Sequence, residues 1–431
     1  MTVSGRLPIL VLLGGIAVAL EPTRRTVLLW VLVCFGLVVL DVILALSPTR
    51  LVIERAAIPQ VRLGESSRSE VVVTNPTRRT LRGHLRDAWV PSAGARGERH
   101  TVRIPGGERR RFRTLLRPTR RGDRHADRVT IRSFGPMRLA ARQRSFDVPG
   151  TIRALPPFDS RKHLPSRLAA LRQLDGRSAV RIRGQGTEFD SLRDYVEGDD
   201  VRSIDWRATA RRRTVVVRTW QPERDRRVIL VLDTSRTSAG RVADQPRLDA
   251  AMDAALLLAA LASRAGDRVD FLAGDRWLRA RVSAGANRTT LLNDLVQAMA
   301  PLDSALLEAS WPTLTSAIAD TSRRRALVVL LTPLEPAAIQ ESLLPSLPAL
   351  TRHHRVVLAS VADPALAMLA SVRETTKDAY AAAAAERTVT LQERTAGVLR
   401  RMGVAVIDAT PAELPPKLAD HYLMLKAQGL L

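Results

Sequence analysis

The sequence of 431 residues contains a single cysteine, Cys34, which lies inside an apolar segment. One cysteine excludes a disulfide within the chain and a zinc site built on cysteine ligands, so the fold does not depend on an oxidising compartment. Aromatic residues make up only 4% of the chain, which leaves few surfaces on which nucleic-acid bases could stack. The Walker A, HExxH and GxSxG motifs are also missing, so the sequence carries no signature of a P-loop NTPase, a zincin or an α/β-hydrolase.

Lysine is scarce as well, and nearly all of the 67 basic residues are arginines. The formal net charge is +24, and it is concentrated in residues 51–227, which hold 41 basic and 20 acidic residues. Residues 228–431 are almost balanced, with 22 basic and 21 acidic residues. Two interpretations stay open: a compositional drift toward arginine, or a basic face that binds anionic lipid head groups, nucleic acid or an acidic protein.

Two apolar runs lie near the N-terminus, at residues 7–20 and 26–46, and a short loop with Arg24 and Arg25 separates them. The second run corresponds to about 31 Å of helix, which is enough to cross a bilayer. The first run is shorter and needs flanking residues or a thinner bilayer to cross. We therefore expect a transmembrane helical hairpin over residues 1–50.

The hairpin would place the protein in the cell membrane with two spans and with the bulk of the chain in the cytoplasm. A cleaved signal peptide is the alternative, because Arg6 and residues 17–19 resemble its charged start and its cleavage site. Asp41 interrupts the second run near its end, where its side chain is expected to reach the membrane interface.

Three further regions follow. Residues 51–155 contain short alternating apolar runs punctuated by glycine and proline, which predicts an all-β, sandwich-like domain. Residues 156–227 form a charged connector. In residues 228–431 apolar strands alternate with helices, which predicts a doubly wound, mostly parallel α/β sheet of Rossmann type. Its first strand is expected at residues 227–233, and such sheets bind ligands beyond the carboxyl ends of their strands.

Asp233 follows that first strand, with Ser235 and Thr237 at alternate positions after it. This carboxylate and these two hydroxyls have the spacing of the metal-ion-dependent adhesion site of von Willebrand factor A domains, and such hard oxygens suit Mg²⁺. A complete site also takes an aspartate after a later strand and a threonine from another loop. A degenerate loop, kept only for structure, is the alternative.

The additional ligands are not evident in the sequence. The later strand, at residues 326–332, runs into Thr332, and no aspartate follows it directly. Glu335 is a displaced stand-in for the aspartate. Thr289 and Thr290 are weak candidates for the distal threonine.

Residues 184–211 carry a dense pattern of acids, arginines, glycines and aromatics. Its candidate interaction residues are Gly184, Gly186, Glu188, Phe189, Arg193, Tyr195, Gly198, Asp199, Asp200, Arg202, Asp205, Trp206 and Arg211. The acids alternate with arginines, so internal ion pairs are expected, and Tyr195 and Trp206 are expected to pack as anchors. The segment would then be a rigid connector, a surface that recognises a partner, or an acidic cluster that holds a metal.

This pattern resembles the defining motif of the bacterial family known as domain of unknown function 58. The resemblance implies two membrane spans, a β-domain, the motif and a von Willebrand factor A-like domain. It also implies a non-enzymatic membrane-anchored adaptor or scaffold that works with a MoxR-type AAA+ ATPase in a chaperone-like assembly. Mg²⁺ at the Asp233 loop is the only expected cofactor. Two alternatives remain: a metal-dependent hydrolase using Asp199, Asp200 and Asp205, and a basic protein that binds lipid or nucleic acid.

Overall fold

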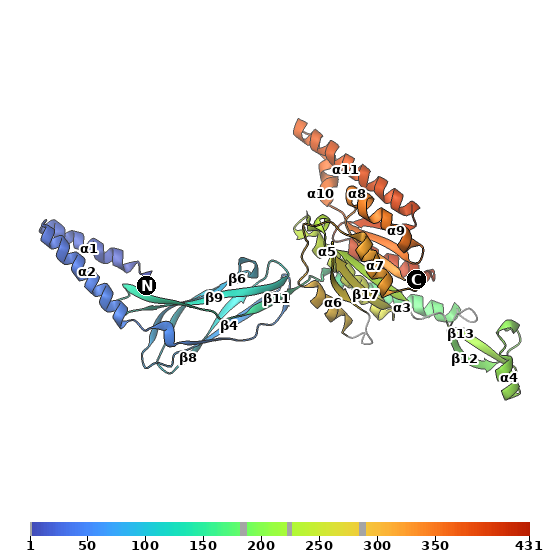
Figure 1. The fold of residues 1–431 in the computed structure, drawn as a ribbon, viewed down its shortest axis with the longest axis horizontal. Helices are drawn as coiled ribbons and strands as arrows, with labels where there is room; N and C mark the ends of the chain where they lie inside the picture. Colours follow the sequence, from blue (N-terminus) through green and yellow to red (C-terminus); the bar gives the residue numbers. More distant parts are fainter. Residues whose placement is uncertain (1, 182–187, 222–225, 284–289) are drawn as a thin grey trace. The chain divides into compact units, whose positions relative to one another are not determined.

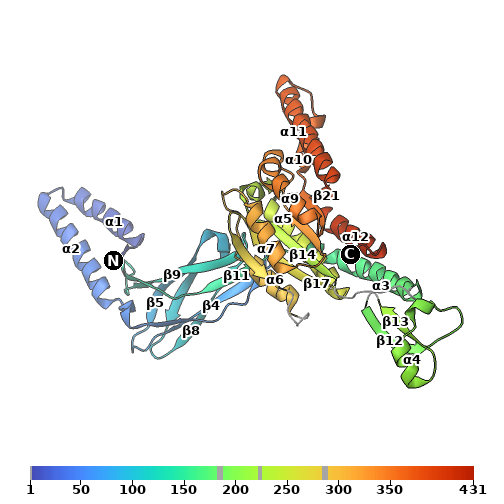
Figure 2. The same cartoon turned by 45° about the vertical axis from the view of Figure 1, so that its right-hand side comes forward.

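A computed structural model describes residues 2–181, 188–221, 226–283 and 290–431. The chain divides into two compact units, Met1–Leu155 and Pro156–Leu431, whose elements are labelled in Figure 1 and seen from a second direction in Figure 2. The first unit contains two N-terminal helices and a β-domain (residues 51–155). The second contains a hairpin module (residues 188–221) and an α/β domain (residues 226–431). The expected multidomain organisation, with β-sheets and a mixed α/β part, is confirmed.

The two N-terminal helices are α1 (Arg6–Leu20) and α2 (Arg24–Leu44), which contact each other. A Cβ at Gly14 would lie 1.9 Å from Trp30 Nε1, so only glycine permits this close approach. Within the part of the chain that the structure describes, one helix, Arg24–Arg50, is long and apolar enough to cross a membrane, with a mean hydropathy of 2.9. The expected apolar helix of the second run is thus confirmed, whereas a crossing by the shorter α1 stays a prediction.

Two mostly antiparallel sheets share the core of the β-domain, and β3 and β11 form a parallel pair within one of them. One sheet contains β1 (Thr2–Val3), β10 (Ala140–Phe146), β9 (Gly122–Phe134), β11 (Thr151–Leu155), β3 (Val61–Arg62), β5 (Leu81–Trp89) and β7 (Arg99–Ile104). The other contains β2 (Val52–Arg55), β4 (Ser67–Thr74), β8 (Arg109–Leu116) and β6 (Ala95–Arg96). Alternate residues of the strands, such as Val71 and Val73 of β4 and Leu81 and Leu85 of β5, point into the shared core, as the period of two requires.

Asp41 of α2 is completely buried, which differs from the expectation that it reaches the membrane interface. Its Oδ1 accepts a hydrogen bond from Met137 N at 2.9 Å, and its Oδ2 accepts bonds from Leu139 N at 2.7 Å and Ala140 N at 3.0 Å. These amides belong to the turn between β9 and β10 and to the first residue of β10. The carboxylate therefore fastens the end of α2 to the β-domain, because the buried amides of Leu139 and Ala140 would otherwise lack this acceptor.

A six-stranded sheet forms the centre of the α/β domain. Its order is β18 (Leu278–Val282), β17 (Arg268–Gly274), β14 (Arg227–Asp233), β19 (Leu327–Leu331), β20 (Arg355–Val361) and β21 (Val404–Ala409). All neighbours are parallel except β17 and β18, so β18 is an antiparallel edge strand. The chain order reverses between β14 and β19, and the carboxyl ends of parallel strands at such a point create a crevice for ligands.

Helices cover both faces of this sheet (Figure 2). The core of one face contains residues from α7 (Trp311–Thr321), α9 (Leu344–Thr351) and α11 (Thr376–Arg401). On the other face α5 (Arg247–Arg264) contacts the central strands and α12 (Leu414–Ala427). Further helices of the unit are α3 (Leu164–Arg181), α6 (Leu291–Met299), α8 (Pro336–Ala338) and α10 (Pro364–Ser371), with a π-helical turn at Ile339–Leu343. The sequence analysis did not anticipate α3, α7 and α10.

Candidate functional site

Asp233 ends β14 at the point where the sheet order reverses, and its side chain is buried. Its Oδ1 accepts a hydrogen bond from Ser235 N at 2.8 Å. Its Oδ2 accepts bonds from Thr332 Oγ1 at 2.7 Å and from Thr237 Oγ1 at 3.2 Å. Ser235 Oγ lies 2.9 Å from Thr237 Oγ1. The structure thus brings the three predicted residues together and adds Thr332, which follows the neighbouring strand β19.

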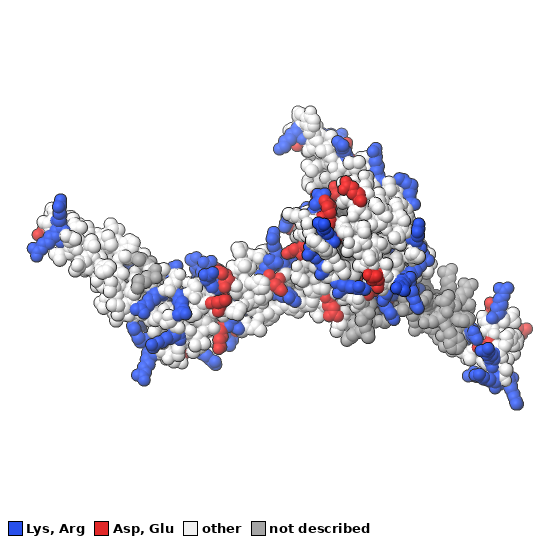
Figure 3. All heavy atoms as spheres, viewed as in Figure 1, with Lys and Arg blue, Asp and Glu red and all other residues white. Residues whose placement is uncertain are grey.

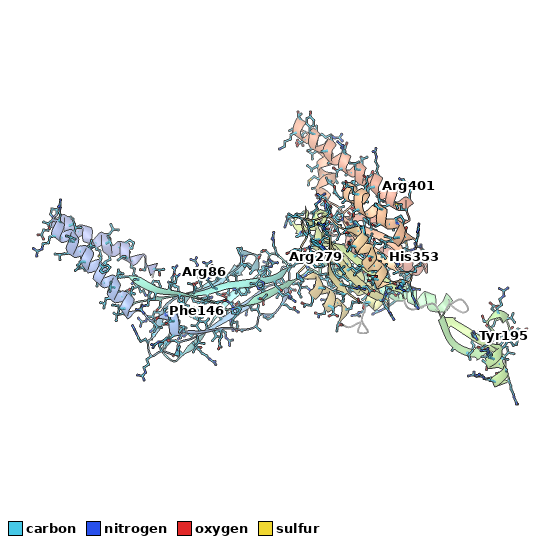
Figure 4. The ribbon with its side chains drawn as sticks, in the orientation of Figure 1. Arg86, Phe146, Tyr195, Arg279, His353 and Arg401 are labelled. Atoms are coloured by element: carbon cyan, nitrogen blue, oxygen red, sulfur yellow. The ribbon has the colours of Figure 1, made fainter. Side chains whose placement is uncertain are left out.

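The carboxylate of Asp233 has no positive partner among the described residues, since only hydroxyls and a backbone amide donate to it. Burial raises its pKa, and the hydrogen bonds from Thr332, Ser235 and Thr237 oppose that rise without reversing it. Asp275, which directly follows β17, shows the contrast. Burial acts to raise its pKa, but hydrogen bonds, first that from Arg279 Nε at 2.8 Å, outweigh burial, and the pKa is lowered. Figure 4 labels this arginine. Of these two buried carboxylates, Asp233 is therefore the one without a cationic partner among the described residues.

The donor set of this site fits a hard divalent cation. Asp233, Ser235, Thr237 and Thr332 offer one carboxylate and three hydroxyl oxygens, which are the ligand types that Mg²⁺ accepts alongside water. Thr237 is the partly exposed member, so the site is open to solvent on its side. The described residues contain no group of three or more histidine, cysteine, aspartate or glutamate side chains that could hold a metal. With one carboxylate, a bound ion would keep positive charge and open coordination positions for an acidic group of a partner.

The other residues proposed for this site lie elsewhere. Glu335 is the residue that precedes α8, and it makes no cap hydrogen bond with its side chain. Thr290 is the N-cap of α6, and Thr289 lies outside the described residues. Thr332 was not predicted as a ligand, because an aspartate was expected after this strand. Its position directly after an apolar strand, like that of Asp233, was the signal that could have identified it, since parallel neighbours end at the same edge.

The hairpin module contains most of the motif. Strands β12 (Glu188–Asp194) and β13 (Val216–Gln221) pair antiparallel, and the segment between them forms turns and the short helix α4 (Trp206–Arg212). Glu188 and Phe189 belong to β12, whereas Gly184 and Gly186 lie outside the described residues. Figure 4 labels Tyr195. Its backbone N–H donates a hydrogen bond to Val215 O at 2.8 Å, next to the paired ends of β12 and β13.

Three aspartates of this module, Asp199, Asp200 and Asp205, bind groups of the same module. Asp199 accepts hydrogen bonds from Arg193 Nη2 at 2.6 Å and Val196 N at 3.0 Å, and these two contacts, that from Arg193 first, lower its pKa. Gly198, with a φ of 105°, supplies the left-handed turn that brings Asp199 back to them. The expected internal pairing of acids with arginines is confirmed for Asp199.

The other two aspartates are helix caps. Asp200 accepts a bond from Arg202 N at 3.0 Å. Asp205 caps α4 through Arg207 N and Ala208 N, each at 3.0 Å, and also accepts a bond from Arg218 Nε at 2.8 Å. The cap from Ala208 and then Arg218 lower its pKa. These are the roles that aspartate commonly has at helix starts, and they leave the hydrolase alternative without a carboxylate directed at a shared site.

Trp206 differs from its expected role as a packed anchor, because it is 68% exposed. Val196, Val201 and Val215 of the same module are also exposed, and Arg211 lies exposed in the last turn of α4. A large aromatic side chain that remains in solvent beside arginine is the composition typical of residues that dominate binding energy at protein interfaces. The module therefore presents apolar surface that its own fold does not cover.

Comparison with known proteins identifies the family of this chain. The family described as "Protein of unknown function DUF58" matches residues 191–414, which is more than half of the chain. The chain belongs to the DUF58 family. The matched range includes the motif from Arg193 to Arg211 and the whole Asp233 site, so both are parts of the DUF58 region.

Curated relatives and solved structures add little on function. The uncharacterized proteins Rv1480 of Mycobacterium tuberculosis and Mb1516 of Mycobacterium bovis are each 28% identical over 227 residues, which is 52% of this chain and 65% of the relative. The match thus spans less than two thirds of these relatives. The conserved hypothetical protein BatB from Bacteroides thetaiotaomicron gives a TM-score of 0.30 at 10% identity, covering 47% of this chain and 99% of that one. That score supports no conclusion.

The raised pKa of Asp233 gives a test of this DUF58 site. Because the folded-state pKa lies above the ordinary value, the ionised carboxylate costs stability, and that cost grows as pH rises through the raised pKa. Asp233→Asn removes the charge at nearly constant shape. In chelator at neutral pH we expect this variant to be more stable than the wild type by roughly 0.5–2 kcal/mol, and the difference should vanish at acidic pH. Thermal unfolding of the full chain measures it.

The cation dependence supplies the control for this prediction. Mg²⁺ at about ten times its dissociation constant should stabilise the wild type by about 1.4 kcal/mol and leave Asp233→Asn unchanged. An Asn variant that is less stable than the wild type at every pH would mean that Asp233 is a structural acceptor only.

Proposed function

We propose that this DUF58 protein is a membrane-anchored, non-enzymatic adaptor whose α/β domain is of von Willebrand factor A type and contacts a MoxR-type AAA+ ATPase. The single observation that carries the proposal is the Asp233 site: a buried carboxylate without a positive partner, surrounded by hydroxyls, at the reversal point of a parallel sheet. A Mg²⁺ held by Asp233, Ser235, Thr237 and Thr332 would accept an acidic side chain of the partner, as hard cations do.

The strand order supports a von Willebrand factor A-type domain. One antiparallel edge strand, β18, extends an otherwise parallel sheet, and helices lie on both faces. The loop that bears Asp233, Ser235 and Thr237 follows the first strand of that sheet. Fold alone does not assign a function, so the proposal depends on the site.

The first unit supports a two-span anchor. β1 precedes α1 and pairs with β10, with Val3 opposite Ala140, and the end of α2 is fixed to the same part of the β-domain through Asp41. The start of α1 and the end of α2 therefore lie on one side. If α2 crosses the bilayer, the chain can reach the far end of α2 only by crossing through α1. The exposed apolar side chains of both helices, such as Leu12 and Leu28, fit a lipid environment.

The exposed Trp206 supports a second contact of the adaptor. Interfaces are enriched in tryptophan and arginine, and the hairpin module exposes both. We place the partner's contacts on two surfaces: the Asp233 site, which depends on the cation, and the hairpin module, which does not.

Affinity capture of the tagged full-length protein from solubilised membranes tests the proposal. Wild type, Asp233→Ala and Trp206→Ala are compared with Asp244→Ala, which removes an exposed carboxylate from a turn of the same domain. Each variant is captured with Mg²⁺ and ATP and again with a chelator. We expect mass spectrometry to identify a MoxR-type AAA+ ATPase with wild type and Asp244→Ala, and at least tenfold less with Asp233→Ala or with the chelator, a loss of about 1.4 kcal/mol or more.

The variants separate the parts of the proposal. Capture that persists with Asp233→Ala but fails with Trp206→Ala would retain the adaptor and reject the cation-mediated contact. Absence of an AAA+ ATPase from every sample would reject the partnership.

A further inference from the structure

We propose that the end of the β-domain from which α2 emerges is a binding surface for anionic phospholipid head groups. This inference rests on the proposed membrane anchor. Its evidence is separate, because it comes from the position of arginines relative to the end of α2 and from their lack of acidic partners.

Several turns meet at the end of α2. The turn between β9 and β10 binds Asp41 through Met137 N, Leu139 N and Ala140 N. The turn after β4 is attached as well, because the guanidinium of Arg79 donates to Leu44 O. Arg142 Nε donates to Val42 O at 2.9 Å. An apolar helix that crosses a membrane would hold these turns at the level of the lipid head groups, within one Debye length of their charge.

The turn after β7 joins the same surface. Asn75 Nδ2 donates to Ile104 O at 3.0 Å and to Pro105 O at 3.2 Å, which ties the turn after β7 to the turn after β4. A Cβ at Gly106 would lie 2.4 Å from Thr77 O, so the two turns are in direct contact. The β-domain therefore presents at least three connected turns beside the end of α2.

Exposed arginines cover this end. We call Arg50, Arg78, Arg82 and Arg103 the membrane-side arginines; all four are exposed. Figure 3 shows lysine and arginine side chains gathered on the part of the β-domain next to the helices. The acid of these turns, Glu108, lies 3.6 Å from Arg110. The whole β-domain holds 24 basic and 9 acidic residues, so acids cannot neutralise its arginines.

The sheet also places arginines directly opposite one another. Arg82 of β5 faces Arg103 of β7, and Arg86 faces Arg99 four positions further along, on the same face. Arg86, labelled in Figure 4, has Glu98 at 3.0 Å, but no ion pair is found for Arg82 or Arg103 within the described part of the chain. Like charges opposite each other in a sheet destabilise it, and a layer of anionic phosphates outside the protein would remove that cost.

Phospholipids are the occupant that this position favours. The end of α2 cannot leave the surface, because Asp41 fixes it, and each arginine near an anionic leaflet contributes about 1 kcal/mol. A nucleic acid would need stacking residues, which the chain largely lacks.

Spin-labelled lipids test the inference in bilayers that contain the full-length protein. The measurement is the fraction of labelled phosphatidylglycerol that the protein immobilises, relative to labelled phosphatidylcholine. We expect the wild type to prefer phosphatidylglycerol about fivefold and the variant Arg50→Gln/Arg78→Gln/Arg82→Gln/Arg103→Gln to bind both lipids equally. The matched control, Arg68→Gln/Arg96→Gln/Arg117→Gln/Arg120→Gln, removes the same charge from exposed positions at the opposite end of the strands and should keep the preference.

The outcomes separate this inference from the anchor. An undiminished preference in the membrane-side variant, or an equal loss in the control variant, would overturn the lipid surface while leaving the anchor intact. If the protein immobilises neither lipid, the chain does not enter the bilayer, and the anchor and the lipid surface both fail. Hydrogen exchange of the core strands β5 and β9 should match among the three proteins, which shows that any change is not one of folding.

Discussion

Asp41→Ala is expected to detach the end of α2 from the β-domain. The substitution leaves the amides of Met137, Leu139 and Ala140 without the acceptor that holds them at 2.7–3.0 Å. The amides of Leu139 and Ala140 are buried, and each unsatisfied buried donor costs roughly 1–3 kcal/mol, so the loss should be about 2–6 kcal/mol. Hydrogen exchange of these three amides in the full-length protein should become at least about 100-fold faster.

Gly135→Ala tests the same contact from the other side. A Cβ at this position would lie 2.1 Å from Asp41 Oδ1 and 2.2 Å from Asp41 O, so the helix end must move away. We expect a similar acceleration of exchange although Asp41 is intact. Asp147→Ala, which removes an exposed carboxylate from the same domain, should change nothing. Normal protection of the β9–β10 turn in both Asp41→Ala and Gly135→Ala would show that the helix end does not depend on this contact.

The role of Asp41 illustrates what the sequence could not show. An aspartate near the end of an apolar run looks like an interfacial residue, because nothing in its neighbourhood indicates a partner 96–99 positions away. The register of the β9–β10 turn against α2 arises only when the β-domain has folded. The burial of Asp41 therefore depends on the tertiary fold and not on the residues around it in the sequence.

Elements with strong local signals could be predicted closely. β14 has the expected bounds, since it is a continuous apolar run between Arg227 and Asp233. Helix α7 was missed because Trp311 and Pro312 open a segment rich in serine and threonine, although proline is well tolerated in a first turn. Trp206 was expected to be buried, but α4 has only seven residues and too few apolar neighbours to cover it.

About half of the candidate site could be predicted from the sequence. The order of Asp233, Ser235 and Thr237 in one loop is a local pattern, so the sequence could locate it. The bond from Thr332 depends on β19 lying beside β14, and the two residues are 99 positions apart. Whether the Asp233 loop binds Mg²⁺ stays a prediction, and Thr332 offers the sharpest way to test it.

Thr332→Asp is expected to make the stability of the α/β domain strongly dependent on Mg²⁺. Thr332 Oγ1 lies 2.7 Å from Asp233 Oδ2, so the new carboxylate would lie against the existing one in a buried site. Two adjacent carboxylates cannot both ionise without cost. In chelator at neutral pH we expect a loss of about 2–4 kcal/mol, and stability should return as pH falls, because protonation of the pair removes the repulsion.

A divalent cation should reverse this loss, since two carboxylates bind Mg²⁺ better than one carboxylate and a hydroxyl. Hydrogen exchange of the β14 and β19 amides, measured in the full chain with chelator and with Mg²⁺, reports the effect where it arises. Thr332→Val is the matched control: it has nearly the same shape but neither hydroxyl nor charge, so it should lose the bond to Asp233 and gain no more from Mg²⁺ than the wild type does. Equal exchange of Thr332→Asp with and without Mg²⁺ would show that position 332 is not a cation ligand, and the Asp233 loop would then be a structural turn.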